Sequence, residues 1–186
     1  MKQIYLSSLL AVFLSIVGTK ASAYDIVVMN EDGAYICYNF INNKTELAVA
    51  QGPVTRSSST FYSGNIVIPE SVTYNDNTYR VTSIANYAFS TNSWSFFDSG
   101  GSGSGLTSVT IPNSVTEIGF QAFFGCSNLT SVHISDLAAW CKIEFGGDYS
   151  NPLYYAHHLY LNGEEIKDLV IPNSVTSVFK ELVHSN

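Results

Sequence analysis

Positive charge is scarce in this chain. It has 8 Lys and Arg against 15 Asp and Glu, a formal net charge of -7 over 186 residues. Nucleic acid binding depends on clustered Lys and Arg, so this balance argues against it. Attraction to an anionic membrane surface by charge alone is disfavoured for the same reason. Charged residues amount to only 12% and hydrophobic residues to 46%, so we expect most of the chain to fold.

Cysteines are few and none lies in a CxxC pair. Cys37, Cys126 and Cys141 are far apart in the sequence, so zinc or redox chemistry has no support. We expect all three to be small buried apolar residues. An exported protein also allows two of them to pair, and the sequence does not decide their disulfide state.

Long apolar runs are absent except at the start of the chain. Lys2 precedes an apolar stretch over residues 4–17, and Ala21-Ser22-Ala23 has the small-x-small pattern of a cleavage site. We therefore expect a signal peptide and a secreted or cell-surface protein with no membrane span in the mature chain. A membrane anchor is the alternative, but the run is shorter than the ~20 residues that a span needs.

A repeat is the main positive feature of the sequence. Leu-Thr-Ser-Val begins at Leu106 and again at Leu129, a separation of 129 minus 106, or 23 residues. The word Ile-Pro-x-Ser-Val occurs at 68–72, 111–115 and 171–175. One unit this short cannot bury its own apolar face, whereas stacked units can. The repeat therefore predicts a mainly β solenoid.

A single unit is expected to contain two strands and a small helical turn. Apolar, β-branched residues nearly alternate from Leu106 to Ile111, which indicates a strand. Pro112 cannot donate to a ladder and should end it. A second short strand is predicted at 115–118, and a helical turn at 122–126 should place Phe123 in the core.

The chain divides into segments of different composition. We expect a signal peptide at 1–23, an N-terminal β cap at 24–65 and repeats at 66–186. The repeats are interrupted by a Gly- and Ser-rich insertion at 94–105 and an aromatic insertion at 136–169.

Short motifs predict local structure inside the cap and the second insertion. Asp32-Gly33 and Asn162-Gly163 each lie between apolar segments, which predicts two hairpins. Residues 136–143 are expected to form a short helix, with Leu137 and Trp140 three positions apart.

The words from Leu106 to Gly119, followed by Ala-Phe-Phe-Gly-Cys-Ser-Asn-Leu at 122–129, resemble the BspA-type leucine-rich repeat family. The resemblance covers roughly residues 64–178. It implies a short leucine-rich-repeat solenoid in an exported bacterial protein that acts in adhesion or protein binding, without catalytic residues. At 179–182 the chain departs from the family pattern, so we expect a short or truncated member or a piece of a longer one.

Two surfaces are candidates for binding. The aromatic insertion carries Tyr and Trp, which are typical of binding hot spots. Packing of the insertion on the solenoid is the preferred explanation for Trp140 and Phe145, and it explains Tyr154 and Tyr155 as simply as binding does. Polar residues of the repeat should form a row on one solenoid face, which serves either binding or solubility. The candidate residues are Tyr154, Tyr155, Tyr149, Trp140, Thr107, Thr110 and Asn113.

Metal binding and catalysis have weak support. His157 and His158 are adjacent, so in a strand their rings point to opposite faces. Glu164 and Glu165 are more simply explained as solvated hairpin residues than as a glycosidase pair. We expect no cofactor and no metal site, and a carbohydrate-active enzyme is the least favoured function.

The preferred hypothesis is therefore a secreted or cell-surface leucine-rich-repeat protein that mediates adhesion. Its expected partner is a surface or matrix protein of a host or neighbouring cell, or a glycan, and not a nucleic acid. The alternative is a structural or assembly module that self-associates by stacking through its open solenoid end.

Overall fold

The computed structural model describes residues 24–30, 32–53, 62–90 and 105–168. The predicted signal peptide, the insertion at 94–105 apart from Gly105, and the last copy of the repeat word lie outside the described residues. The proposed division into a cap and a repeat region stays a prediction.

One sheet consists of the first strand of each successive coil and one hairpin strand at its end. Its five strands follow the order β12-β11-β9-β7-β4. The pairs β4–β7, β7–β9 and β9–β11 are parallel, and β11–β12 is antiparallel. The strands are β4 (Ser63–Val67), β7 (Gly105–Thr110), β9 (Ser131–Ile134), β11 (Leu159–Leu161) and β12 (Glu164–Glu165).

A second sheet of seven strands contains the second strand of each coil and the N-terminal strands. Its order is β1-β2-β3-β6-β8-β10, with β5 also paired to β6. The pairs β3–β6, β6–β8 and β8–β10 are parallel, and the remaining pairs are antiparallel. The strands are β1 (Ile26–Met29), β2 (Tyr35–Ile41), β3 (Glu46–Val49), β5 (Ser71–Tyr74), β6 (Asn77–Ile84), β8 (Glu117–Ile118) and β10 (Glu144–Phe145).

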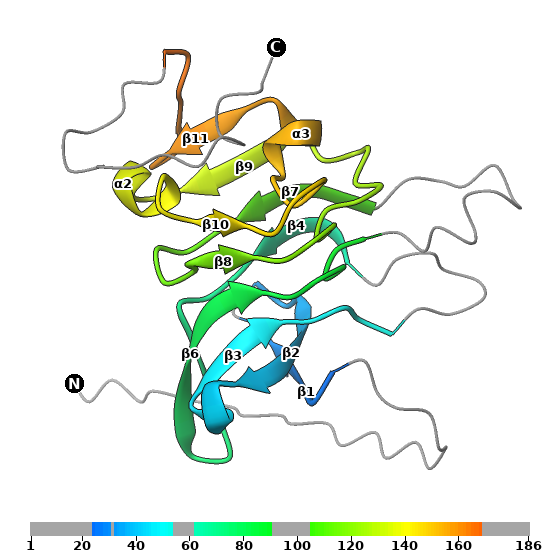
Figure 1. Cartoon of the computed structure of the whole chain (residues 1–186), viewed down its shortest axis with the longest axis vertical. Coiled ribbons are helices and arrows are strands. Elements are labelled where there is room, and N and C mark those ends of the chain that lie inside the picture. Colours follow the sequence, from blue (N-terminus) through cyan, green and yellow to red (C-terminus); the bar gives the residue numbers. More distant parts are fainter. Residues whose placement is uncertain (1–23, 31, 54–61, 91–104, 169–186) are drawn as a thin grey trace, which may run out of the picture.

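The chain alternates between the two sheets and rises one strand per coil along the long axis of the molecule (Figure 1). Equivalent positions of the repeat motif pair with one another across neighbouring strands, because Val109 lies opposite Ile66 on one side and Val132 on the other. Ile118 likewise lies opposite Ile84 and Phe145. The prediction of a mainly β, leucine-rich-repeat solenoid is therefore confirmed.

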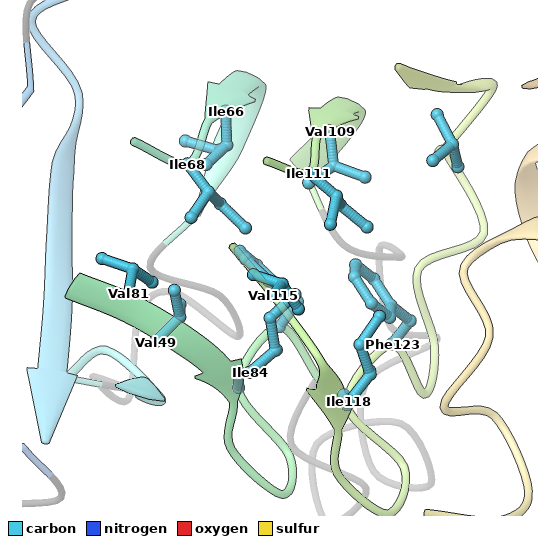
Figure 2. Close-up of a cluster of buried hydrophobic side chains, with 14 of the residues drawn as sticks. Val49, Ile66, Ile68, Val81, Ile84, Val109, Ile111, Val115, Ile118 and Phe123 are labelled. Atoms are coloured by element: carbon cyan, nitrogen blue, oxygen red, sulfur yellow. The ribbon is translucent and has the colours of Figure 1, made fainter. Parts of the chain in front are cut away.

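Side chains from both sheets meet in one apolar core. Figure 2 shows Ile68 and Ile111, which directly follow β4 and β7, pointing toward Ile84 and Ile118 of the other sheet. Each of these side chains is buried. Burying a Val or Ile side chain stabilises the fold by about 1.5–3 kcal/mol, so stacking replaces the core that a single unit lacks.

A third side of the solenoid is made of turns. The expected helical turn at 122–126 is instead a series of turns with i to i+3 hydrogen bonds, such as Cys126 N to Phe123 O (3.0 Å). The backbone groups are also used between coils, since Phe89 N donates to Ala122 O (2.8 Å). Phe123 is buried as expected and stacks on Phe89, with ring centroids 5.0 Å apart.

The N-terminal strands are joined to the first coil by Tyr62. Its hydroxyl accepts from Cys37 N (3.1 Å) and donates to Ala50 O (2.7 Å), while its ring lies 4.8 Å from that of Phe89. Burial raises the pKa of the Cys37 thiol to about 12. All three cysteines are buried, which confirms the expectation that they act as small apolar residues.

Short elements complete the fold. A 3₁₀ turn, η1 (Asn42–Lys44), joins β2 to β3. The expected helix in the aromatic insertion is α2 (Leu137–Trp140), and α3 (Leu153–Ala156) follows β10. Both hairpins are present as expected: β1 pairs with β2, and β11 pairs with β12 through Asn162 and Gly163, whose φ angles are 52° and 88°. Positive φ at both turn positions is what a type I′ turn requires.

Candidate binding surface

Three tyrosines of the aromatic insertion form one group on the surface. We call Tyr149, Tyr154 and Tyr155 the tyrosine cluster. Tyr149 lies in the turn after β10, and the other two lie on α3, which Figure 1 places at one end of the solenoid. Tyr154 is 56% exposed, and Tyr149 and Tyr155 are half-buried.

The rings of the cluster pack on one another. Tyr154 meets Tyr149 and Tyr155 edge to face, with both centroid distances at 4.9 Å. Tyr149 and Tyr155 are nearly parallel at 6.3 Å. Such pairs add about 0.5–1.5 kcal/mol beyond their buried area, so the exposed ring of Tyr154 has two aromatic supports.

Hydrogen bonds attach the cluster to the preceding coil. The Tyr155 hydroxyl accepts from Gly125 N (3.0 Å), and Tyr149 O accepts from Phe123 N (3.0 Å). At the start of α3, Asn151 Oδ1 accepts from Leu153 N (3.0 Å). The cluster is therefore positioned by residues about one coil earlier in the sequence, and its backbone is fixed before a partner arrives.

Two phenols of the cluster, those of Tyr149 and Tyr155, are uncharged at neutral pH. The neighbouring Tyr154 phenol raises the pKa of Tyr149, and burial raises the pKa of Tyr155. Both hydroxyls therefore keep their protons, since a free Tyr already titrates only near pH 10. The surface combines apolar ring area with hydroxyl groups, which suits a partially polar protein surface.

Sequence reasoning missed one member of this surface. Phe124 is half-buried, and its ring lies edge to face with Tyr149 at 5.1 Å. The available signal was the adjacent pair Phe123-Phe124. When the first ring enters the core, the second points outward, and here it supports the tyrosine cluster.

Trp140 does not belong to the candidate surface, and its assignment there is corrected. It is 2% exposed and lies in the core, with its ring 5.7 Å from that of Phe145. The reason is the position of α2, whose N-cap Asp136 accepts from the amides of Ala138 and Ala139. The helix places Trp140 at its last position, directed inward against β10.

The polar row lies on and beside β7 and shares no described contact with the tyrosine cluster. Thr107 is exposed, and its carbonyl accepts from Thr130 N (2.9 Å). Thr110 lies in register with His133, and Asn113 Oδ1 accepts from Ser135 Oγ (3.0 Å). The seven candidates are thus two separate surfaces and one core residue.

The outer face of the five-stranded sheet continues that polar row. His133 stacks on Tyr160 at 4.8 Å, and its Nε2 lies 3.3 Å from Ser131 Oγ. His158 Nδ1 pairs with Glu165 Oε1 at 2.5 Å. These groups satisfy one another within the face, and we assign them no chemistry.

Other kinds of site have little support among the described residues. Among residues 24–30, 32–53, 62–90 and 105–168, no group of three or more His, Cys, Asp or Glu is arranged to hold a metal ion. In the same residues no helix has the length and apolar character needed to cross a membrane. A shallow surface depression lies between the turn at Asn113 and α2, with Trp140 and Ile143 in its wall.

These features define a parallel β solenoid with an aromatic surface at one end. Residues 101–143 match the family model described as the BspA type leucine rich repeat region. That part of the chain is therefore similar to the BspA-type leucine-rich repeat that the sequence motifs indicated.

Three solved structures resemble the chain. A leucine-rich repeat protein from Bacteroides ovatus is 31% identical, with a TM-score of 0.42, over 61% of this chain and 24% of that protein. A leucine rich cell surface protein from Faecalibacterium prausnitzii is 26% identical, with a TM-score of 0.40, over 62% and 25%. A leucine-rich repeat protein from Bacteroides capillosus is 22% identical, with a TM-score of 0.41, over 68% and 93%. None of the curated proteins matches the chain.

Proposed function

We propose that this chain is the binding part of an exported bacterial protein that attaches to a protein of a host or neighbouring cell, or of its matrix. The tyrosine cluster is the proposed contact. The observation that carries the proposal is the 56% exposed ring of Tyr154, supported from two sides by Tyr149 and Tyr155.

The physical argument concerns entropy and desolvation. A Tyr side chain offers a large contact area with only two rotatable bonds, so little conformational entropy is lost on binding. In this cluster the supporting rings already restrict Tyr154, which lowers the loss further. Interface hot spots are enriched in such residues, and their truncation commonly weakens binding by 2 kcal/mol or more.

The direct test is an array of purified matrix and cell-surface proteins probed with residues 24–186. For a protein that binds, Tyr154→Ala should weaken the affinity at least about 30-fold, which corresponds to about 2 kcal/mol. Tyr154→Phe keeps the ring and should retain most of the affinity.

Tyr87→Ala is the matched control. Tyr87 is also exposed, at 44%, but its ring pairs with Phe120 instead of the cluster. It should leave affinity unchanged. Equal losses for Tyr87→Ala and Tyr154→Ala would remove the cluster from the binding site, and a folded chain that binds nothing on the array would remove adhesion.

A further inference from the structure

A second exposed apolar surface lies at the other end of the molecule. Val27, Met29 and Tyr35 are 38%, 48% and 50% exposed. Met29 and Tyr35 are direct cross-strand neighbours of the β1–β2 hairpin, and Val27 lies two positions before Met29 on the same face. We call these three residues the edge strip. They are half of the exposed large hydrophobic residues in the described part of the chain.

The backbone beside the edge strip is open. Within the described residues β1 pairs with β2 alone and ends the seven-stranded sheet. Asn30 N donates to Ala34 O (2.9 Å), so this pair of residues is hydrogen-bonded between β1 and β2. Cys37, which lies opposite Val27, instead uses its carbonyl to accept from Ala50 N on the far side of β2. Hydrogen-bonded and non-bonded pairs alternate in an antiparallel ladder. The amides and carbonyls of Val27 and Met29 therefore point away from β2, toward the open edge.

Residues 26–29 lack the features that normally prevent strand pairing, although the charged Asp25 directly precedes them. Natural edge strands carry Lys, Pro, a bulge or an inward-pointing charge. Residues 26–29 read Ile-Val-Val-Met, and their pairing with β2 is regular along the whole strand. A regular apolar edge of this kind is a template for another strand.

A second copy of the same strand matches the edge on three counts. Its outward backbone groups have the same spacing, because they belong to the same two residues. An antiparallel pair of β1 strands places Val27 and Met29 of each copy on one continuous face, which is the self-complementary arrangement of a two-fold interface. Residues 26–29 carry no charge, so the new ladder itself brings no like charges together.

We propose that two copies of this chain pair through β1 into a two-fold dimer. The two seven-stranded sheets become one continuous sheet, and the edge strips of both copies lie side by side on one face of it. β1 and α3 lie toward opposite ends of the long axis (Figure 1). The dimer therefore carries its two tyrosine clusters at its far ends.

The arrangement bears on adhesion, and this step alone rests on the proposed function of the tyrosine cluster. Two linked contacts bind a dense target surface more tightly than one, by about 10²–10⁴-fold where both engage. A single cluster of three rings offers a small contact area. Dimerisation would offset the weak affinity of one cluster by letting two clusters bind at once.

The experiment is light scattering after size exclusion on residues 24–186 over a wide range of protein concentration. The wild-type chain should show twice the monomer mass at the higher concentrations. Val27→Lys puts a charge in the ladder and should raise the dissociation constant at least about tenfold, with an unchanged circular dichroism spectrum. Met29→Lys is the second variant and should act in the same way.

Tyr154→Lys is the matched control, because it adds the same charge at an exposed site remote from β1 and should leave the dimer intact. A wild-type chain that stays monomeric throughout overturns the proposal, even where β1 captures a strand of another protein. Dimers that persist in both Val27→Lys and Met29→Lys also overturn it. Loss of array binding in Tyr154→Ala without a change of mass separates the two proposals.

Discussion

Two successive coils of the solenoid share their interior and differ on their exterior. The regular coil, residues 105–130, and the inserted coil, residues 131–158, place equivalent side chains in the same ladders. Val109 pairs with Val132, and Ile118 pairs with Phe145. The core therefore continues through both coils without a break.

The difference lies in what the inserted coil adds. It carries α2 between its two strands and α3 after them, whereas the regular coil has only turns at both places. One added ring, that of Trp140, enters the core, and the tyrosine cluster stays outside. The repeat fixes the inside of a coil, while insertions are free to alter its outside. The broken part of the repeat is therefore where we expect the functional surface.

The largest expected effect tests whether the insertion is as integral as the repeat. Phe123→Ala in the regular coil and Trp140→Ala in the inserted coil should each lower the free energy of unfolding by about 3–5 kcal/mol, because both rings are fully enclosed. Urea denaturation followed by circular dichroism measures both. Tyr154→Ala serves as the exposed control and should change stability by about 0.5 kcal/mol or less.

The outcome for Trp140 decides the comparison. A loss below about 1 kcal/mol would match a surface substitution and not a core one. The insertion would then be an appendage on a solenoid that is stable without it. A loss equal to that of Phe123→Ala would make the inserted coil part of the same cooperative core.

The interior of both coils was predictable from the sequence. Alternating β-branched residues predicted the strand, and Pro112 predicted its end. Side chains of a strand alternate between its two faces, so the apolar Val109 and Ile111 also identify the buried face. The Asn162-Gly163 turn was equally clear, because a type I′ turn needs positive φ at both positions.

The exterior of the inserted coil was only partly predictable. Trp140 and Tyr154 are both large aromatics in the same insertion, and composition does not say which one is buried. That depends on α2 and on contacts far apart in sequence, such as the Tyr155 hydroxyl with Gly125 N. The sequence predicted that the polar row is exposed. It did not show that the row lies apart from the tyrosine cluster, because that depends on how the coils are arranged in space.

The second test concerns glycines that hold the two coils together. Ala85, Gly119 and Gly146 occupy equivalent positions, since their amides donate to the carbonyls of Val49, Ile84 and Ile118 at 2.8 Å each. Only the coil that contains Ala85 has a side chain at this position; the two later coils have glycine. A Cβ at Gly119 would lie 2.6 Å from Asn86 N, and one at Gly146 would lie 2.7 Å from Phe120 N.

Gly119→Ala and Gly146→Ala should therefore each destabilise the protein by about 1–3 kcal/mol through overpacking against backbone. Equal losses would show that the regular and inserted coils approach their neighbours equally closely. Thermal unfolding measures the effect. A neutral Gly146→Ala beside a damaging Gly119→Ala would mean that the inserted coil sits more loosely on the stack.

A smaller effect is expected at the N-cap of α2, which only the inserted coil has. Asp136 Oδ1 accepts from Ala138 N (2.8 Å) and Ala139 N (3.1 Å). Asp136→Ala leaves these amides without their cap and should cost about 1 kcal/mol. Asp136→Asn keeps an acceptor and should cost little. If both variants behaved alike in urea denaturation, charge and not the hydrogen bond would be the stabilising feature.

The smallest effect is expected in the regular coil, at Ser114 of the Ile-Pro-x-Ser-Val word. Ser114 is buried, and its hydroxyl has no hydrogen-bond partner among the described residues, whereas the equivalent Ser71 of the preceding coil is exposed. A buried unsatisfied hydroxyl is unfavourable. Ser114→Ala should therefore stabilise the chain by up to about 1 kcal/mol, measured as a higher urea midpoint at unchanged slope. Ser71→Ala should change nothing. A loss of stability in Ser114→Ala would instead show that the hydroxyl is bonded within the regular coil, and that this coil, too, depends on a polar contact the repeat word does not reveal.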